Sequence, residues 1–490
     1  MKVFVDESSA GAGKTRDAIA RIVAQPCKAI FITERKIAFA ELDSRMRKAA
    51  RKAGTAPIIR HIHSDNHGGR GVAKRIGELP NDCSSLAHVI VIATHEALLR
   101  SDFSSFASWQ IIIDEVPRFL DFQEKRTALD APFFERHYSL TSVADGWTTV
   151  DLTPAGRALT VADVRTDESH SHLDLFHARV LEAGQPNGTR MVMCNLPDWS
   201  GMKGKKVTWC WASVFSLRAL EAFERVELLG NRFRDDIGAR ITTFLDREEV
   251  EWETLPPPRS DGSATPRSVL IHFFSDRPSA KSWFGETDGQ HLLREIGQYL
   301  STALPDDAIW TANEKGDWGK PTPKELLALN AGTYVKPKQA GTNAFRKLHH
   351  AAMIYAAKPS ENLRSLLRVL KIDCHLWTRS VEFEAVLQFA TRTSVRDPDS
   401  AAPVSLWVFD RAQATYLKEY FEAQPHITAS MTQVPLAIGI PPKQKGGRPP
   451  CVLTPEQEAA RKADRRARDT AQKRMNRLAK AAQAKFHPPK

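Results

Sequence analysis

The chain has 490 residues, enough for two or three domains with sizeable cores. It contains no apolar run long enough to span a bilayer, and its N-terminus enters a strand directly, without the pattern of a signal peptide. The six cysteines are scattered without a C-x-x-C pair, so the sequence suggests neither a zinc ribbon nor a disulfide framework. We therefore expect a cytoplasmic protein with no membrane partner.

The net charge of +11 is concentrated at the end of the chain. Residues 441–490 hold 14 lysines and arginines against 4 acidic residues, so the rest of the chain is almost neutral. This asymmetry predicts a nucleic acid or another polyanion as a partner. A helix is predicted over residues 455–485, after a Pro/Gly/Lys-rich hinge at 441–450. The candidate phosphate contacts of this basic tail are Arg448, Arg465 and Arg466.

The N-terminal strand leads into a loop that is typical of phosphate binding. Residues 8–15 read Ser-Ser-Ala-Gly-Ala-Gly-Lys-Thr, between an apolar run at 3–5 and a segment with helical periodicity. The first glycine of the usual G-x-x-x-x-G-K-[ST] pattern is Ser8 here. The predicted ATP ligands are Gly11 and Gly13, whose backbone can curl around phosphate oxygens, Lys14 for the β- and γ-phosphates, and Thr15 for Mg²⁺.

A second acidic element is expected to complete this site. Residues 109–117 read Trp-Gln-Ile-Ile-Ile-Asp-Glu-Val-Pro, which predicts a strand buried on both faces that ends in two carboxylates. Asp114 is placed to hold Mg²⁺, and Glu115 to polarise the water that attacks the γ-phosphate. Together with the phosphate loop, this pair predicts an ATP hydrolase.

The first 120 residues alternate strand-like and helix-like segments, which is the rhythm of a parallel sheet flanked by helices. Strands are expected at 29–33, 88–94 and 111–113, and a further buried strand at 207–215. A second α/β unit is expected to follow, with strands at 268–274, 352–355 and 404–409. The predicted organisation is a first domain over 1–253 with an insertion at about 121–200, a linker over 254–266, a second domain over 267–440, and the tail over 441–490.

The second unit is expected to supply positive charge to the transferring phosphate. Gln388, Arg392 and Arg396 follow one another at intervals of four residues, so on a helix all three project from nearly one face. Guanidinium groups in this position can stabilise charge on the γ-phosphate as an arginine finger does.

These elements together resemble the superfamily 2 helicases and translocases, of the DEAD/DEAH-like kind and of a phage- or plasmid-borne type. Gly13-Lys14-Thr15 resembles motif I, and Asp114-Glu115-Val116-Pro117 resembles motif II. Residues 269–275 resemble motif IV, and residues 388–396 resemble motif VI, although the second arginine stands one position later than in the family. Motif III is matched either by Ala212-Ser213 or by Thr153.

The resemblance implies two tandem RecA-like parallel-sheet domains with ATP and Mg²⁺ between them. It also implies nucleic-acid contacts at Thr33 in a segment that resembles motif Ia, at Thr94 in one that resembles motif Ib, and at Asn343 in one that resembles motif V. Motif II reads DEVP, and the chain begins too close to motif I for the glutamine element of DEAD-box RNA helicases. We therefore expect DNA more than RNA as the substrate.

The predicted function is an ATP-dependent nucleic-acid helicase or translocase, with a protein loader or a replication partner. An alternative from another class stays open. In a DNA-packaging or defence-complex ATPase, ATP would switch DNA binding without separating strands.

Overall fold

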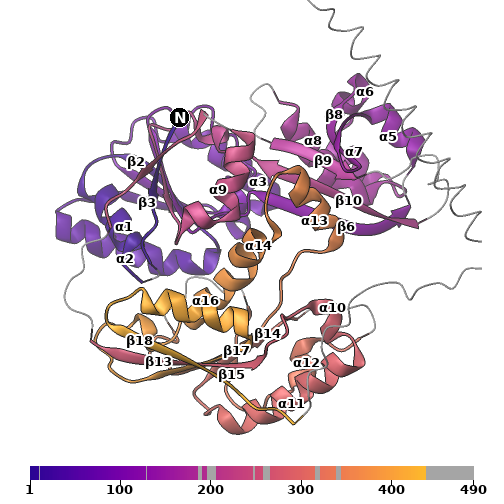
Figure 1. Cartoon of the computed structure of the whole chain (residues 1–490). Coiled ribbons are helices and arrows are strands. Elements are labelled where there is room, and N and C mark those ends of the chain that lie inside the picture. The colour runs from indigo at the N-terminus through magenta and orange to yellow at the C-terminus, as the bar shows by residue number, and fades with distance from the viewer. Residues whose placement is uncertain are drawn as a thin grey trace, which may run out of the picture. The chain divides into compact units, whose positions relative to one another are not determined.

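The computed structural model describes residues 1–9, 11–128, 130–185, 190–195, 206–246, 249–257, 265–314, 320–337 and 344–437. Two separate parallel sheets carry helices on both faces, which confirms the tandem RecA-like α/β domains expected from the sequence (Figure 1). Within the described ranges, none of the helices combines the length and the apolar character that crossing a membrane requires.

The first parallel sheet has seven strands. Side chains alternate along each strand, so that Ile30 and Ile32 face one core while Ala29 and Phe31 face the core under helices α1 and α2. The strand order is β12 (Glu251–Thr254), β1 (Lys2–Asp6), β11 (Arg225–Leu229), β5 (Trp109–Asp114), β2 (Lys28–Thr33), β4 (Val89–Thr94) and β3 (Ile58–His61). The accompanying helices are α1 (Lys14–Ala24), α2 (Phe39–Ala53), α3 (Ser64–Asp82), α4 (His95–Leu98) and α9 (Ile237–Leu245).

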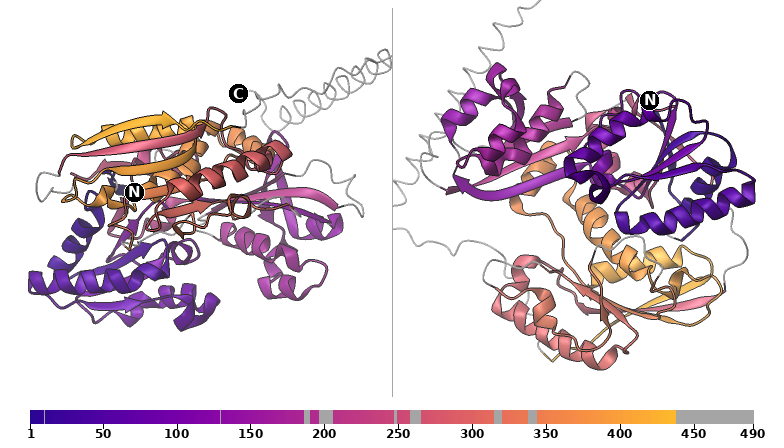
Figure 2. Two further views of the ribbon diagram at one scale, coloured as in Figure 1. Left: turned by 90° about the horizontal axis from the view of Figure 1, so that it is seen from below. Right: turned by 180° about the vertical axis from the view of Figure 1, so that it is seen from behind.

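An insertion between β5 and β11 forms an antiparallel sheet of its own, in magenta tones in Figures 1 and 2. The strand order is β6 (Leu120–Ala128), β10 (Lys206–Phe215), β9 (Arg190–Asn195), β8 (Trp147–Leu152) and β7 (Tyr138–Ala144). The helices α5 (Ala131–His137), α6 (Pro154–Ala158), α7 (Val161–Thr166) and α8 (Asp174–Ala183) belong to the same insertion.

The strand expected at 207–215 exists as β10, but it pairs with β6 and β9 in this antiparallel sheet. Ala212-Ser213 and Thr153, the two candidates for motif III, therefore both lie in the insertion and not on the parallel sheet. Ser213 accepts a hydrogen bond from Arg190 within the insertion, and Thr153 caps the short helix α6. The strand that lies between β1 and β5 in the first sheet is β11, and its sequence Arg-Val-Glu-Leu-Leu carries no recognisable motif.

The second parallel sheet has six strands. Helices α15 and α16 pack on one face, while α10, α11 and α12 pack on the other. The strand order is β15 (Thr333–Tyr334), β14 (Ile309–Ala312), β16 (His350–Ile354), β17 (Val404–Asp410), β13 (Arg267–Ser275) and β18 (Ile427–Gln433). The helices are α10 (Lys281–Phe284), α11 (Thr287–Ala303), α12 (Pro323–Leu327), α15 (Glu384–Ala390) and α16 (Arg411–Glu422).

Residues 357–383 leave the second domain between β16 and α15 and return to it; we call this excursion the arm. It consists of α13 (Glu361–Val369), α14 (Cys374–Trp377) and a π-helix, η6 (Thr378–Phe383). Leu363, Leu366 and Leu367 of α13 are buried in the same apolar cluster as Trp147 of the insertion. The arm of the second domain therefore completes a core of the first half of the chain, and Figure 1 shows α13 beside β6 and β10.

Candidate nucleotide-binding site

The site lies at the carboxyl ends of three adjacent strands of the first sheet. In the register of the sheet, Asp6 of β1 is opposite Leu229 of β11, and Leu229 is opposite Asp114 of β5. Because parallel strands end at one edge, the loop after β1 and the acidic pair after β5 are brought together there. The two elements predicted from the sequence are thus assembled by the topology of the sheet.

The phosphate loop follows β1 and ends at the first residue of α1. Gly11 and Gly13 have φ values of +87° and +98°, in the left-handed region that glycine adopts without a steric cost. The ammonium group of Lys14 donates to the carbonyl oxygens of Ser8 (2.5 Å) and Ser9 (3.0 Å). Burial lowers the pKa of Lys14, and the nearby Asp6 carboxylate opposes this shift. Lys14 is therefore folded back over its own loop, where polyphosphate oxygens would be stronger acceptors.

The magnesium ligands predicted from the sequence are in contact with each other. The Thr15 hydroxyl donates to both carboxylate oxygens of Asp114, at 3.1 and 3.2 Å. Burial raises the pKa of Asp114, and the Thr15 hydroxyl and the Lys14 charge oppose this rise. A hydroxyl and a carboxylate at one point are the oxygen donors that Mg²⁺ takes, and a bound divalent cation would offset the cost of burying the Asp114 charge.

His95 fixes the backbone at Asp114. Its Nε2 lies 2.9 Å from the Asp114 carbonyl oxygen, and its side chain is buried. Burial lowers the pKa of His95 to about 4, so the imidazole is neutral at physiological pH. Sequence reasoning assigned no role to His95, because one histidine at a helix start carries no pattern.

Glu115 has an unusual backbone for a glutamate. Its φ is +68°, and its N–H donates to the Leu229 carbonyl oxygen at 3.1 Å, so β11 holds the residue in the left-handed conformation. Burial, together with the neighbouring charges of Asp114 and Glu34, raises the pKa of Glu115 to about 8, while Arg396 opposes the shift. A carboxyl with a pKa near neutrality in such a position suits a general base.

Arg392 and Arg396 reach this site from the second domain. A Cβ atom added to Gly11 would lie 3.6 Å from Cγ of Arg396, so the Arg396 side chain lies beside the phosphate loop at Gly11. Burial lowers the pKa of Arg392 to about 10, and the Glu115 charge opposes the shift for both arginines. Among the described residues, buried Nη1 of Arg392 and Nε of Arg396 have no hydrogen-bond partner. Two buried guanidinium groups with spare donors beside a phosphate loop fit the γ-phosphate of a nucleotide.

The arginines do not stand on one continuous helix, and this expectation is wrong. Helix α15 ends at Ala390, and Arg396 closes the short 3₁₀-helix η7 (Ser394–Arg396). The reason lies in the hydroxyl residues between them. The Thr391 hydroxyl donates to the Gln388 carbonyl oxygen (3.3 Å) and the Thr393 hydroxyl to that of Ala390 (2.8 Å), which satisfies carbonyl groups that a longer helix would use.

A buried arginine of the second domain holds in place residues 391–396, the segment that carries Arg392 and Arg396 and that we call the arginine segment. Arg267 at the start of β13 donates to the carbonyl oxygens of Ser394, Asp397 and Ser400, and it is 5% exposed. Burial lowers its pKa. Arg267 does not touch the phosphate loop, so it is a positioning residue for Arg396. No sequence pattern marks it.

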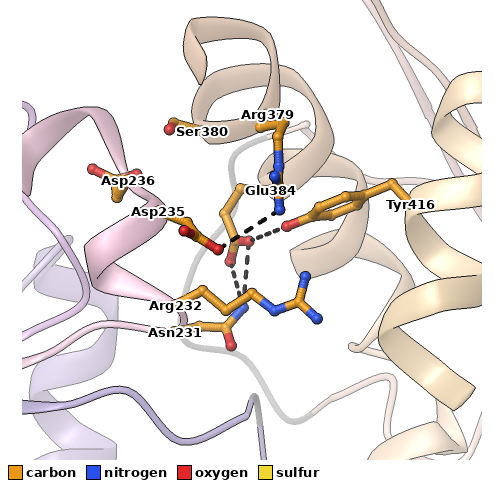
Figure 3. Close-up of a pocket in the computed structure, with 8 residues that line it drawn as sticks. All are labelled: Asn231, Arg232, Asp235, Asp236, Arg379, Ser380, Glu384 and Tyr416. Atoms are coloured by element: carbon orange, nitrogen blue, oxygen red, sulfur yellow. Dashed lines mark hydrogen bonds and ion pairs between the residues drawn. The ribbon is translucent and has the colours of Figure 1, made fainter. Parts of the chain in front are cut away.

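A polar cluster joins the domains next to the phosphate loop (Figure 3). Asn231, two residues after the end of β11, donates to both oxygens of Glu384 at 3.4 Å, and the Tyr416 hydroxyl also donates to Glu384 at 3.4 Å. The guanidinium of Arg232 lies over the Tyr416 ring, 5.9 Å from its centroid. Burial raises the pKa of Glu384, and Lys14 is among the charges that oppose the rise. The chain just after β11, the strand between β1 and β5, is thus linked to the first turn of α15.

The remaining predicted residues are placed as follows. Gln388 lies half-buried on α15, in the turn before the arginine segment. Thr33 and Thr94 are opposite each other at the ends of β2 and β4; Thr33 is only 7% exposed, and the Thr94 hydroxyl caps α4. Asn343, Arg448, Arg465 and Arg466 lie outside the described residues.

Known proteins resemble the chain only remotely. No protein-family model and no curated protein matches it. Among solved structures it is similar to S. tokodaii Xpd4, with 10% sequence identity and a TM-score of 0.41 over 88% of this chain and 96% of that chain. It is also similar to RecG bound to a three-way DNA junction (9%, 0.34, over 86% of this chain and 41% of that chain) and to the DUF1998 helicase MrfA bound to DNA and AMPPNP (11%, 0.31, over 88% and 50%). At these identities and scores, function has to be argued from the site.

Proposed function

We propose that the chain is an ATP-driven nucleic-acid translocase or helicase that acts on DNA in preference to RNA. The observation that carries the proposal is the meeting of three groups at one sheet edge. These are the Thr15–Asp114 pair, the Glu115 carboxyl, and the guanidinium groups of Arg392 and Arg396 from the other domain. A hydrolytic site shared by two domains links their relative position to the state of the nucleotide.

Each residue then has one task. Mg²⁺–ATP would supply the γ-phosphoryl group and its electrophilic phosphorus. Lys14 would turn from the Ser8 and Ser9 carbonyl oxygens to the phosphates, and Thr15 and Asp114 would hold the metal ion. Ionised Glu115 would orient the attacking water and accept its proton, while Arg392 and Arg396 would neutralise charge on the transferring group.

Nucleic acid would lie across the ends of β2 and β4, where backbone contacts are expected from the residues after each strand. Because Thr33 is buried, the half-buried Arg35 and the exposed Lys36 are better placed for phosphates than Thr33 itself. The basic tail would add sequence-independent affinity, which predicts binding that falls steeply with salt. The DEVP sequence of motif II, which departs from the DEAD-box pattern, supports DNA over RNA.

A displacement assay tests this proposal. Oligonucleotides that carry biotin at the 5′ or the 3′ end are loaded with streptavidin, and its release is followed with ATP, for DNA and for RNA of one sequence. Glu115→Gln serves as the control that binds nucleotide without hydrolysing it. We expect ATP-dependent release from one end of the DNA only. Tight DNA binding that ATP modulates, with no release from either end, would instead support an ATP-switched DNA-binding or packaging ATPase.

A further inference from the structure

The arm connects the insertion to the arginine segment through α13, a turn at residues 370–373 and one helical run. Helix α14, the π-helix η6 and helix α15 follow without a break over residues 374–390, and the residues at both junctions keep right-handed helical angles. Arg392 and Arg396 follow directly at the C-terminal end of this run. Its N-terminal end belongs to the arm. A displacement of the arm is therefore transmitted toward the arginines unless the run bends.

The arm is docked on the insertion by apolar and polar contacts. Leu366 and Leu367 of α13 are fully buried in a cluster that includes Trp147 and Ala212 of the antiparallel sheet. The Trp147 indole N–H donates to the Ser365 hydroxyl at 3.1 Å. The start of α13 adds two hydrogen bonds to Glu124 of β6, from Ser360 (3.0 Å) and Asn362 (2.7 Å). This face of the antiparallel sheet is thus covered by a segment of the second domain.

Different segments pack on the two faces of the antiparallel sheet. Val192 and Cys194 of β9 point into the core under helices α5–α8, whereas Met193 between them points into the cluster that holds the arm. Leu173 lies in the core under the helices. The insertion can therefore be perturbed on either face separately, which gives matched variants.

The base of the arm is fixed to the second domain by a buried carboxylate. Glu382 is fully buried and accepts hydrogen bonds from the Ala357 N–H (2.7 Å), the Lys358 ammonium (3.1 Å) and the Gln413 amide (3.0 Å). The Trp377 indole N–H closes the base by donating to the Ala357 carbonyl oxygen at 3.1 Å. The run therefore packs at α14 against the apolar cluster that holds the arm, and its π-helix is anchored to the second domain at Glu382.

The same run also touches the first parallel domain. The Ile237 N–H at the start of α9 donates to the Ser380 hydroxyl at 2.9 Å, and Asn231 binds Glu384 one turn further on. A π-helix interrupts regular α-helical hydrogen bonding and is found frequently at functional sites. A movement of the arm would therefore reach the ATP site through the contacts of the π-helix.

We infer that docking of the arm on the insertion positions Arg392 and Arg396 at the phosphate loop, so that the insertion sets the rate of ATP hydrolysis. This inference rests on the proposed function for its kinetic part only. Residues such as Leu366 are then positioning residues, since they act through the helical run and do not touch the nucleotide.

The test compares Leu366→Ala, which weakens the arm face of the sheet, with Leu173→Ala, which removes the same atoms from the face under the helices. Leu366→Met fills the arm site again with a similar volume. We expect kcat for ATP to fall about 10-fold in Leu366→Ala, because small displacements of a catalytic group are costly, with nucleotide Kd and KM unchanged. Leu366→Met and Leu173→Ala should keep the wild-type kcat.

Hydrogen exchange of nucleotide-free protein gives a readout that needs no activity. Amides of residues 378–396 should exchange faster in Leu366→Ala than in Leu173→Ala, relative to the wild type. Equal kcat values in the two alanine variants, with equal exchange over 378–396, would overturn the inference. If the wild-type chain does not hydrolyse ATP, the proposed function fails, but the exchange comparison still decides whether the arm positions the arginine segment.

Discussion

The side chain of Arg396 lies against Gly11 of the phosphate loop, although the two residues belong to different domains. The distance from a Cβ placed on Gly11 to Cγ of Arg396 is 3.6 Å. The same guanidinium carries a buried Nε without a hydrogen-bond partner in the described part of the chain. This proximity brings a positive charge to the loop whose conformation is suited to phosphate, and it makes the site depend on both domains.

Removal of this charge should slow turnover strongly and spare nucleotide binding. We expect Arg396→Ala to lower kcat by about 10³-fold, the scale of an arginine finger, with Arg396→Lys restoring only part of the loss. Arg392→Ala should also lower kcat, since the Glu115 charge acts on both groups. Steady-state hydrolysis and fluorescent-nucleotide binding measure the two effects. Arg411→Ala, at an exposed ion pair with Asp276 in the same domain, is the control. Full activity of Arg396→Ala would contradict this assignment.

Glu115 should destabilise the fold as the pH rises. Its pKa is raised from 4.5 to about 8 in the folded state, so between these values the unfolded chain releases a proton that the folded chain keeps. Stability from this group is complete below pH 4.5 and is lost as the pH approaches 8. Glu115→Gln has no proton to release, so its melting temperature should exceed that of the wild type at pH 8, and the two should converge near pH 5. A constant difference across this range would show that the Glu115 pKa is not raised.

Arg267 should matter for both stability and catalysis. Arg267→Met keeps the length of the side chain but leaves the carbonyl oxygens of Ser394, Asp397 and Ser400 without their donors. We expect a loss of about 3 kcal/mol in the free energy of unfolding and a lower kcat, because buried carbonyl groups lose partners and Arg396 is released. Urea unfolding and hydrolysis assays measure these. Arg346→Met, which removes the exposed ion pair of Arg346 with Asp397, should change stability by less than about 1 kcal/mol. Equal effects of both variants would argue against a positioning role for Arg267.

Asp114 should set the magnesium requirement. Asp114→Asn keeps a group that can bond to the Thr15 hydroxyl but removes the charge that would hold the ion. We expect the Mg²⁺ concentration for half-maximal hydrolysis to rise about 10-fold, in line with the cost of changing groups that hold a metal ion. Asp102→Asn, in the exposed loop after α4, is the control. An unchanged Mg²⁺ dependence would place the metal ion elsewhere.

The sequence predicts the reacting residues of this site better than the elements and contacts that hold them in place. The phosphate loop and the pair Asp114–Glu115 could be predicted because each follows a short apolar run, and parallel strands end at one edge. The segment at 391–396 could not, since helical spacing alone does not show that threonine hydroxyls end α15 at Ala390. Asn231 and Arg267 went unnoticed because each acts through one long-range contact and belongs to no local pattern.

In the insertion, too, single elements could be predicted from the sequence, whereas their neighbours in the fold could not. Its strand at 207–215 could be predicted from apolar residues, but its partner strands could not, because periodicity does not distinguish a parallel from an antiparallel neighbour. The arm was also beyond prediction. Leu363, Leu366 and Leu367 predict an amphipathic helix, but the surface that covers its apolar face belongs to residues more than a hundred positions away.

Steady-state ATP hydrolysis with and without single-stranded DNA tests the central claim most directly, for the wild type beside Lys14→Ala and Glu115→Gln. We predict strong stimulation by DNA in the wild type and a loss of at least about 10²-fold in both variants, since each removes a group from the reacting centre. Lys28→Ala, at an exposed ammonium that donates to the Ser84 carbonyl oxygen, should behave as the wild type. Hydrolysis that is indifferent to nucleic acid, or that survives in Lys14→Ala, would contradict the account.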